Sequence, residues 1–507
     1  MRALTLPRVP NASPDARLLT VNNVLTGEPL GSVPVMSAVD VAAAVSRARA
    51  AQPAWEAAGV KARTRIMRAW VDLLVAHQDR MMDLIRAETG KSKGGAWGEI
   101  AVLDNVVNYY RRTAPGLLRP SRRQVTFPIF QRAQVVYKPY PVVGFLTPWN
   151  YPLQNGFIDI TAALFAGCAI IIKPSEVTPF TALLAAELLH QAGVPEACAQ
   201  VMTGDGSTGA ALTDSVDYIS LTGSTATGRK VAMRAAERLI PYSLELGGKG
   251  AGIVLEDADL NIAASWSLTG ALENAGQACV AIERVYVLES IHDAYVEKVR
   301  QWADKLVVSA ADDYAVDVGS MTNARELERT EAHIADAVAK GARVLTGGKR
   351  RPDLGPRFLE PTVLVDVTDD MQIMREETFG PVMPIMKVRD LDEAIRRANN
   401  SDYGLSNTLF AGDLNRAMQL ARRLDSGDVM INRPAFAFGT PDLPMGGVKF
   451  SGIGRRNGPE GLRRFLKPQA ILADNMRAVG PSLTQTSART RSLFALLRKI
   501  RPFFPYI

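Results

Sequence analysis

Cysteine and histidine are scarce in this sequence. Its 507 residues include three cysteines (Cys168, Cys198 and Cys279) and four histidines, and they contain no CxxC or HExxH motif. So few cysteines exclude a disulfide-rich scaffold and favour a reducing compartment. Widely spaced histidines outside such motifs predict that the protein holds no metal ion.

Long apolar runs are absent as well. No run of 18 apolar residues occurs, and the opening stretch MRALTLPRVPNASPDARLL lacks the apolar core of a secretory signal. We therefore expect no membrane-spanning helix and a cytoplasmic protein. With 47% hydrophobic and 22% charged residues, the composition is globular, and the length predicts about two to four domains.

Positive charge is concentrated at the C-terminal end. The chain carries a net charge of +7, of which the six basic residues after Asp474 supply +6. The nearly neutral body argues against nucleic-acid binding. In the basic tail, 476–507, Leu493, Leu496, Leu497 and Ile500 form an i, i+3, i+4, i+7 stripe. This pattern predicts an amphipathic helix that contacts a membrane surface, or else a segment that packs on its own oligomer or stays disordered.

Short runs rich in Val and Ile alternate with helical patterns from residue 141 onward. Residues 141–146 and 168–174 are typical of buried strands, and the helix that follows begins at Thr178-Pro179 and ends at Gly193. A second alternating series runs from residue 251 to about 430, whereas the first 120 residues are largely helical. The alternation predicts an α/β fold with two doubly wound units built on parallel sheets.

Candidate catalytic groups lie within this pattern. Cys279, in NAGQACVAIERV, is by itself more typical of a core position than of a nucleophile. Glu245, in LELGGKG, is either a general base whose pKa burial raises or a structural ion-pair partner. Asn150, between prolines at the end of a predicted strand, is placed to donate to an oxyanion. Glu377 precedes the turn Phe379-Gly-Pro, which presents an aromatic ring.

Two glycine turns follow predicted strands. Residues 204–209 match G-x-G-x-x-G, which either presents N–H groups to a phosphate or closes an ordinary αβ unit. The second turn, TGSTATG at 222–228, is no P-loop, because Arg229-Lys230 replaces the required Lys-Ser/Thr pair. Nucleophile, base, oxyanion donor and glycine turns together predict an enzyme with a dinucleotide site.

Seven motifs resemble those of the aldehyde dehydrogenase superfamily in order and spacing, over about residues 25–475. They are TPWNYP, KPSE, TGSTATG, LELGGK, GQAC, EETFGPV and PMGGVKFSGIGR. The resemblance implies a Rossmann-variant cofactor domain, a catalytic domain and a small β oligomerisation arm, assembled as a homodimer or homotetramer. The implied parts are an NAD(P)-binding domain at 1–123 and 141–245, a catalytic domain at 246–440, and an arm with its C-terminal return at 124–140 and 441–475.

The resemblance also implies the chemistry. Cys279 attacks the aldehyde, Asn150 and the Cys279 N–H stabilise the oxyanion, hydride transfer leaves a thioester, and Glu245 activates the water that hydrolyses it. Because relatives that transfer the acyl group to coenzyme A lack the base, Glu245 favours release of a free acid. The implied cofactor contacts are Thr147, Pro148, Trp149, Lys173, Ser175, Glu176, Gly206, Gly223, Ser224, Gly228, Leu246, Glu377 and Phe379. Cys168 and Cys198 are expected to be structural.

Cofactor and substrate remain less well defined. Glu176, three residues after Lys173, would repel a 2′-phosphate, so NAD is preferred over NADP. The chain most resembles the superfamily's succinate-semialdehyde dehydrogenases, yet Ile158 stands where these place a carboxylate-binding arginine. Arg284 matches a basic position shared by many relatives. An apolar wall at Phe157-Ile158 would suit medium- or long-chain or aromatic aldehydes at a membrane surface. A non-catalytic nucleotide-binding scaffold is the alternative from another class.

Overall fold

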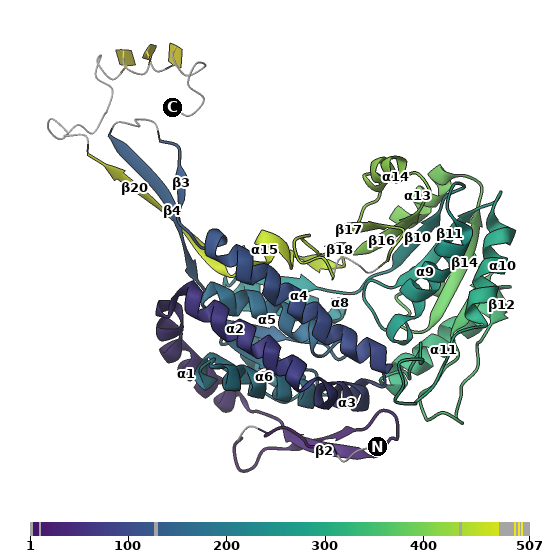
Figure 1. Cartoon of the computed structure of the whole chain (residues 1–507), viewed down its shortest axis with the longest axis horizontal. Helices are drawn as coiled ribbons and strands as arrows, with labels where there is room; N and C mark the ends of the chain where they lie inside the picture. Colours follow the sequence, from purple (N-terminus) through teal and green to yellow (C-terminus); the bar gives the residue numbers. More distant parts are fainter. Residues whose placement is uncertain are drawn as a thin grey trace.

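The structure, a computed structural model, describes residues 4–9, 12–125, 130–434 and 439–475, with 491–492, 495–496 and 498–499. Two α/β lobes lie side by side, and a thin β arm projects from one of them (Figure 1). This confirms the predicted α/β class and the two sheet-containing units.

The first lobe is built on a six-stranded sheet in the order β19-β9-β8-β5-β6-β7. Its strands β5 to β9 are parallel, and β19 joins β9 antiparallel. Every residue of β5 and β6 is buried, as expected for strands that helices cover on both faces. The strands are β5 (Val142–Leu146), β6 (Ala169–Lys173), β7 (Ala199–Val201), β8 (Tyr218–Thr222), β9 (Tyr242–Glu245) and β19 (Gly452–Ile453).

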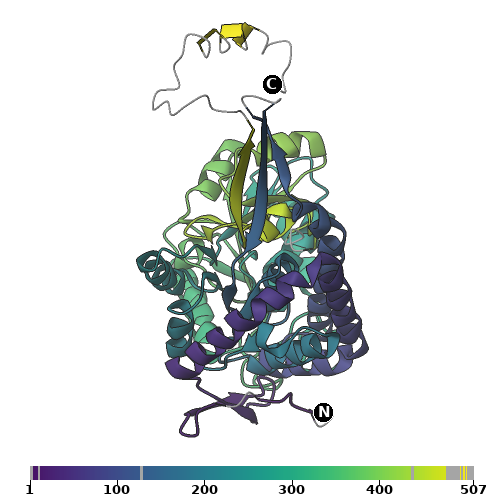
Figure 2. The ribbon, with the colours of Figure 1, turned by 90° about the vertical axis from the view of Figure 1, so that its left-hand side faces the viewer.

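Helices from the N-terminal third and from the crossovers cover this sheet (Figures 1 and 2). The predicted helix α6 begins at Pro179, its first residue, and ends before Gly193, whose φ of +108° suits glycine. The helices are α1 (Ala38–Ala57), α2 (Gly59–Ala76), α3 (Gln78–Thr89), α4 (Lys93–Leu117), α5 (Gln154–Ala166), α6 (Pro179–Ala192), α7 (Gly206–Thr213), α8 (Thr225–Glu237) and α15 (Gly458–Arg463).

The second lobe holds a seven-stranded sheet in the order β12-β13-β14-β11-β10-β16-β17. Its strands are parallel except β12, which pairs antiparallel at one edge. The strands are β10 (Gly250–Val254), β11 (Ile282–Leu288), β12 (Arg343–Thr346), β13 (Thr362–Val365), β14 (Val382–Val388), β16 (Ser406–Phe410) and β17 (Asp428–Ile431). The helices are α9 (Leu260–Leu272), α10 (His292–Ala303), α11 (Ala324–Ala339), α12 (Gln372–Arg375), α13 (Leu391–Asn399) and α14 (Leu414–Ala421).

The arm is a three-stranded antiparallel sheet of β3 (Ser121–Arg123), β4 (Gln131–Pro139) and β20 (Leu466–Asp474). β20 pairs with β4 along its whole length, from Leu466 opposite Pro139 to Asp474 opposite Gln131. Segments from the two ranges implied for the arm thus pair with each other, and Figure 1 shows the arm projecting from the lobe. Its role in oligomerisation stays a prediction.

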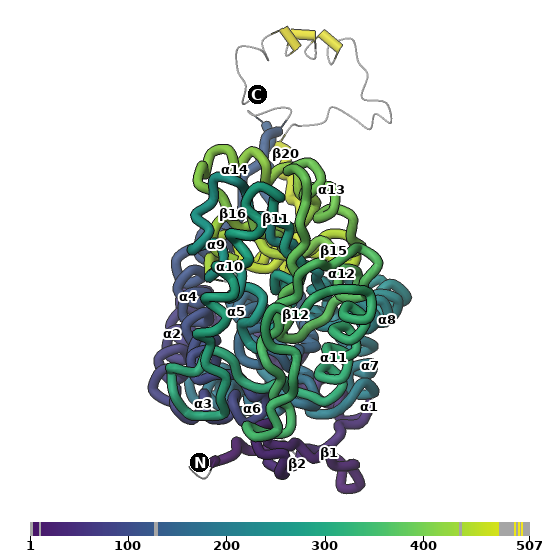
Figure 3. Tube along the Cα trace, turned by 90° about the vertical axis from the view of Figure 1, so that its right-hand side faces the viewer, coloured from purple at the N-terminus to yellow at the C-terminus, as the bar shows by residue number. Residues whose placement is uncertain are grey.

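Two parts of the chain depart from the sequence-based picture or lie beyond it. A hairpin of β1 (Leu18–Asn22) and β2 (Pro29–Pro34), which was not predicted, lies beneath the first lobe (Figure 3). Leu493, Leu497 and Ile500 of the predicted stripe lie outside the described residues; the six described tail residues are helical and exposed. In the part of the chain that the structure describes, no helix has the length and apolarity needed to span a membrane.

Candidate active site

Cys279 lines a cavity of about 250 Å³ between the two lobes. The first lobe contributes Tyr151, Gln154 and Asn155 to its wall, and the second contributes residues of α9 and the segment after β17. Cys279 is partly exposed, whereas Cys168 and Cys198 are buried. Its sulfur is therefore accessible to a small ligand, which a core cysteine is not.

The loop that carries Cys279 has an unusual backbone. Helix α9 stops at Leu272, and the chain after it leaves the helical conformation: Asn274 and Ala275 adopt left-handed φ values of 53° and 54° and Gly276 one of 72°. A Cβ on Gly276 would collide with the carbonyl oxygen of Gly380, so only glycine fits there. Asn274 and Ala275, which are not glycines, are strained in this conformation, and such strain is concentrated at functional sites.

Burial leaves Cys279 protonated at neutral pH. It raises the pKa of the thiol to about 12, with Glu377, Glu245 and Asp428 raising it further and the Arg456 guanidinium opposing them. A thiol with that pKa needs a base to remove its proton as it attacks a carbonyl carbon.

Glu245 has the properties of that base. It ends β9 and is buried, and its Oε1 accepts no hydrogen bond from the described residues. Burial raises its pKa to about 7, and Arg456 partly offsets this effect. A carboxylate titrating near neutral pH can take a proton from a thiol or a water and release it again.

Asn150 lies where β5 leads into the site. Its Nδ2 donates to the carbonyl oxygen of Gln277 at 3.0 Å, which ties it to the loop that carries Cys279. A side-chain amide has two N–H donors, so the second one is left for a ligand. The predicted oxyanion donor and the nucleophile loop are thus brought together.

Glu377 and Phe379 meet the same region from the second lobe. Glu377 accepts from the Gly248 N–H at 2.8 Å, and burial raises its pKa, as does the nearby Glu283. Phe379 has a left-handed φ of 55°, and its ring packs edge-on against Trp149 at 5.5 Å between centroids. The structure therefore places the predicted pair Trp149 and Phe379 in contact across the two lobes.

The two glycine turns differ in what occupies the start of the following helix. At α7, which begins with Gly206, the Asp205 carboxylate caps the N-terminus and pairs with Arg17, so a phosphate would meet a negative charge there. At α8, the uncharged Ser224 is the cap and accepts from the Thr227 N–H. The helix dipole favours an anion at the second turn, which fits the pyrophosphate of a dinucleotide at Gly223 and Ser224.

The other predicted cofactor residues gather at the ends of β5, β6 and β9. A Cβ on Gly228 would lie 2.6 Å from the Leu246 side chain, so α8 packs closely on the segment after β9. Lys173 is buried and its Nζ lies 3.2 Å from Glu176, whose side chain is 51% exposed. Thr147 donates its N–H to the Lys173 carbonyl. Thr147, Pro148, Ser175 and Leu246 therefore line one sheet edge with Lys173.

The expected apolar substrate wall is wrong. Phe157 and Ile158 are 0% and 1% exposed and do not line the cavity. Phe157 packs on Trp70 instead, because α5 turns Gln154 and Asn155 toward the cavity. Arg284 is also remote from substrate, since its guanidinium is buried and donates to the Lys249, Arg397 and Ala398 carbonyls.

Most residues of the cavity wall were not predicted, among them Trp266, Glu273 and Arg433. Trp266 lies on α9, Glu273 directly follows that helix, and Arg433 follows β17 with its guanidinium 4.8 Å from the Trp266 ring centroid. The helical spacing of Trp266, Thr269, Gly270 and Glu273 is the signal that could have identified this wall. No pattern in the sequence places Arg433 near Cys279.

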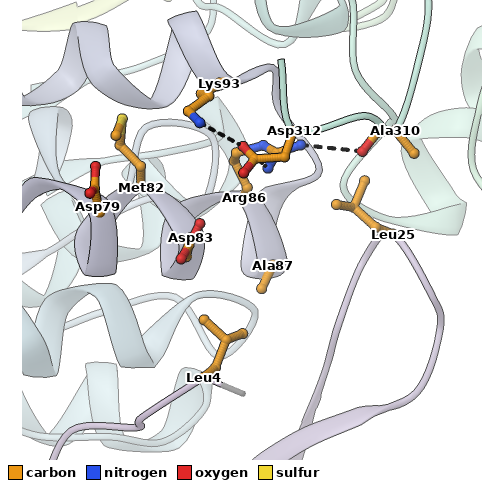
Figure 4. A pocket seen from close by; sticks show the side chains of 10 residues that line it. All are labelled: Leu4, Leu25, Asp79, Met82, Asp83, Arg86, Ala87, Lys93, Ala310 and Asp312. Carbon is orange, nitrogen blue, oxygen red and sulfur yellow. Dashed lines mark hydrogen bonds and ion pairs between the residues drawn. The ribbon is translucent and has the colours of Figure 1, made fainter. Parts of the chain in front are cut away.

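A second cavity, of about 510 Å³, lies between α3 and the loop at 310–312 (Figure 4). Among its charged side chains, Lys93 and Arg86 pair with Asp312, and Asp79 and Asp83 also line it. It shares no lining residue with the cavity at Cys279 and contains none of the predicted site residues. Among the described residues, no group of three or more His, Cys, Asp and Glu is arranged to hold a metal ion.

Comparison with known proteins identifies the family of this chain. The sequence profile of the aldehyde dehydrogenase family matches residues 11–471. A Mycobacterium ulcerans protein named "Putative succinate-semialdehyde dehydrogenase [NADP(+)] 2" is 42% identical over 92% of each chain. The glutarate-semialdehyde dehydrogenase of Pseudomonas aeruginosa is 37% identical over 89% of this chain and 93% of its own. 

Among solved structures, a Mycobacterium tuberculosis aldehyde dehydrogenase complexed with NAD+ superposes with a TM-score of 0.87. It is 35% identical, over 93% of this chain and 98% of its own. With the family profile covering most of the sequence and the same fold in a solved member, this chain belongs to the aldehyde dehydrogenase family and is an NAD(P)-dependent aldehyde oxidoreductase.

Proposed function

We propose that the enzyme oxidises short aldehydes carrying a distal carboxylate, with succinate semialdehyde as the first candidate, to the corresponding dicarboxylic acids. The observation that carries this proposal is Arg433 at the cavity that holds Cys279. A guanidinium is always charged and matches a carboxylate with two parallel hydrogen bonds. The names of the Mycobacterium ulcerans and Pseudomonas aeruginosa relatives support the same substrate class.

The backbone contacts of the residues next to Arg433 support a role for its side chain in binding the substrate carboxylate. Asn432, at a left-handed φ of 62°, exchanges two side-chain hydrogen bonds with the backbone of Ala411. Pro434 sits so close to Gly270 of α9 that a Cβ there would lie 2.7 Å from its ring. The backbone on either side of Arg433 is thus fixed, and a preorganised arginine loses less entropy when it binds an anion.

The size and charge of the cavity point the same way. Its volume of about 250 Å³ is below the range of drug-sized sites and suits a molecule of a few carbon atoms. Burial raises the pKa of Glu273, the carboxylate on the wall, while the nearby Lys91 and a hydrogen bond from Tyr151 lower it. Arg433 is the cationic side chain among the residues that line this cavity.

The proposed reaction uses Cys279, Glu245 and Asn150 in sequence. Glu245 takes the thiol proton as sulfur bonds to the aldehyde carbon, and the resulting oxyanion accepts from Asn150 Nδ2 and the Cys279 N–H. A bound nicotinamide would supply the hydride acceptor, and Cys279 would then hold the acyl group as a thioester. Glu245, having released its proton, takes one from water; hydroxide adds to the thioester carbon, the carbon–sulfur bond breaks, and the thiolate is reprotonated. The product is the free acid.

The dinucleotide would be held by the residues at the sheet edge. Gly223 and Ser224 would meet the pyrophosphate, Glu377 the nicotinamide ribose, and Phe379 and Trp149 the ring side. We further propose that NAD is preferred, because the half-exposed Glu176 beside Lys173 would bind ribose hydroxyls and repel a 2′-phosphate. The Mycobacterium ulcerans relative, named for NADP, makes this the point to measure first.

A substrate panel tests the proposal. We expect succinate and glutarate semialdehydes to have kcat/KM values about 10- to 100-fold above butanal and pentanal, since a charged hydrogen bond contributes about 1.5–3 kcal/mol. NAD+ and NADP+ are compared at matched concentrations. Equal values for charged and neutral aldehydes, or a preference for 4-aminobutanal through Glu273, would contradict the substrate assignment. A higher kcat/KM with NADP+ would contradict the cofactor preference.

A further inference from the structure

Two buried lysine–glutamate pairs lie behind the site, and neither takes part in the chemistry above. Lys91 and Glu99 are 2.5 Å apart with both side chains 0% exposed. Lys249 and Glu283 are 2.6 Å apart with side chains 0% and 5% exposed. Taking two charges out of water is costly, and such pairs often stabilise a fold no better than apolar residues would. We therefore expect the role of these two pairs to lie in the backbone segments that they hold in place.

The first pair holds the loop of Asn150. Glu99 Oε2 accepts from the backbone N–H groups of Leu153 and Gln154, each at 2.9 Å. Lys91 Nζ donates to the Asn150 carbonyl oxygen at 2.9 Å and lies 3.9 Å from the Tyr151 ring centroid. Both partners thus bind the segment 150–154, which carries the oxyanion donor and one wall of the cavity.

The second pair holds the loop of Glu377 and Phe379. Glu283 accepts from the N–H groups of Thr378 and Phe379 at 2.7 and 2.9 Å. Lys249 Nζ reaches the Thr378 hydroxyl at 3.4 Å. The left-handed backbone of Phe379 is strained and needs such support, because a side chain other than glycine rarely adopts it unaided.

The two pairs repeat one arrangement on opposite sides of the site. In each, a carboxylate binds two consecutive backbone N–H groups of a functional loop, and a buried ammonium neutralises it. We propose that Lys91–Glu99 and Lys249–Glu283 are positioning residues, the first fixing the oxyanion-binding loop and the second the loop that meets the nicotinamide ribose. This inference rests on the proposed roles of Asn150, Glu377 and Phe379.

The chain offers a matched control at Glu88. This carboxylate is also buried and accepts from two consecutive N–H groups, those of Phe180 and Thr181, at 2.7 and 2.8 Å. It holds the start of α6, which contributes nothing to the cavity at Cys279. Glu88→Gln therefore shows how removing the charge of a buried carboxylate affects the protein when the contacts of the two loops are unchanged.

The test uses double variants that remove both charges of a pair together, so that neither partner of the pair is left buried alone. Lys91→Met/Glu99→Gln and Lys249→Met/Glu283→Gln are compared with Glu88→Gln in the full-length enzyme. Three quantities are measured: the burst rate of NADH formation, the Kd of NAD+ from quenching of protein fluorescence, and the thermal midpoint. The single variants Glu99→Gln and Glu283→Gln serve if a double variant fails to fold.

The expected results separate the two loops. Displacing a catalytic group by about 1 Å costs about 100-fold in rate. The first double variant should lower the burst rate about 10- to 100-fold with the Kd of NAD+ within twofold of wild type. The second should raise the Kd of NAD+ about 10-fold or more. Glu88→Gln should lower the thermal midpoint and change neither quantity.

Other outcomes overturn the inference. If both double variants change the midpoint alone, as Glu88→Gln does, the pairs are structural and position nothing. If each variant affects burst rate and NAD+ binding equally, the division between the loops is wrong. A wild-type enzyme that forms no NADH with any aldehyde would instead refute the proposed function, so the two failures are distinguishable.

Discussion

Cys168 and Cys279 carry the same side chain in two regions of the molecule whose surroundings differ. Cys168 precedes β6, is fully buried, and donates its S–H to the Phe465 carbonyl oxygen at 3.6 Å. Cys279 lines a cavity on a loop of left-handed residues. Burial raises the pKa of both thiols far above the usual range. Acidity alone therefore does not mark the nucleophile.

Access and neighbours make the difference. Cys279 has Glu245 close enough to affect its titration, and Glu245 itself titrates near neutral pH. The groups that act on Cys168 are its Tyr140 backbone bond and charges at Arg63, Glu56 and Lys467, none of them a base beside an open cavity. A reactive cysteine here is a thiol with a base and a path for substrate, rather than a thiol with a low resting pKa.

The largest expected effect is at the nucleophile. Cys279→Ala should lower kcat by at least about 10⁴-fold, because no other group in the site can form the covalent intermediate. NAD+ binding should be retained and is measured by fluorescence titration as a control for folding. Substantial aldehyde oxidation by this variant would contradict the assignment of Cys279 as the nucleophile.

The next effect is at the base. Glu245→Gln should lower steady-state kcat about 10²- to 10⁴-fold, the usual contribution of a general base. Glu245 assists both steps, so acylation should slow as well, but water is a poorer nucleophile than a thiol and thioester hydrolysis should slow more. A slowed single burst of NADH should therefore remain. Stopped-flow absorbance distinguishes the two phases. Loss of the burst with hydrolysis intact would show that Glu245 serves only the thiol.

A third effect is expected at Arg433, which the cavity of Cys279 contains and the surroundings of Cys168 lack. Arg433→Gln should raise the KM for succinate semialdehyde about 10- to 100-fold and leave that for butanal unchanged, since only the former carries a carboxylate. Arg433→Lys should restore part of the loss. An equal rise in KM for both substrates would mean that Arg433 affects the shape of the cavity and does not bind the carboxylate of the substrate.

The pH dependence should be smaller. Because the pKa of Glu245 is about 7, the base is protonated below that value and ionised above it. The kcat should therefore rise with pH through about 7, with a limiting slope of about tenfold per unit on the acid side. Residual activity of Glu245→Gln should lack this limb. A wild-type profile that is flat from pH 6 to 8 would contradict the assigned base.

The smallest effect is expected at the other cysteine. Cys168→Ala leaves a small void beside β6 and should lower the free energy of unfolding by about 1–2 kcal/mol. Its kcat and KM should match those of wild type. Denaturant titration and steady-state assays check both. A large kinetic defect would mean that the structural cysteine is coupled to the site after all.

Local signals predicted much of this molecule. The buried strands β5 and β6 read directly as apolar runs, and Pro179 and Gly193 bound α6 because both act through their own backbone. The resemblance assigned the separate segments that contain β4 and β20 to one arm, and the structure pairs these two strands. Cys279, Glu245 and Asn150 were identified through their motifs, and the structure brings Asn150 and the Cys279 loop together.

The features that were not predicted depend on tertiary contacts that no local sequence pattern indicates. The left-handed backbone of Asn274 and Ala275 goes with the close approach of Gly276 to the Gly380 carbonyl oxygen, a contact between segments about 100 residues apart. The choice of Phe157 and Ile158 as a substrate wall failed because the facing of α5 is set by packing on Trp70. Arg433 reaches the cavity from more than 150 residues beyond Cys279, a partnership that no spacing predicts.

The most direct measurement is intact-protein and peptide mass spectrometry on Glu245→Gln incubated with NAD+ and succinate semialdehyde. The account predicts an acyl adduct, bound as a thioester, on the peptide that contains Cys279 and not on those containing Cys168 or Cys198. Hydroxylamine should remove it. No adduct despite NADH formation, or an adduct on another residue, would contradict the claim that this cysteine carries the reaction.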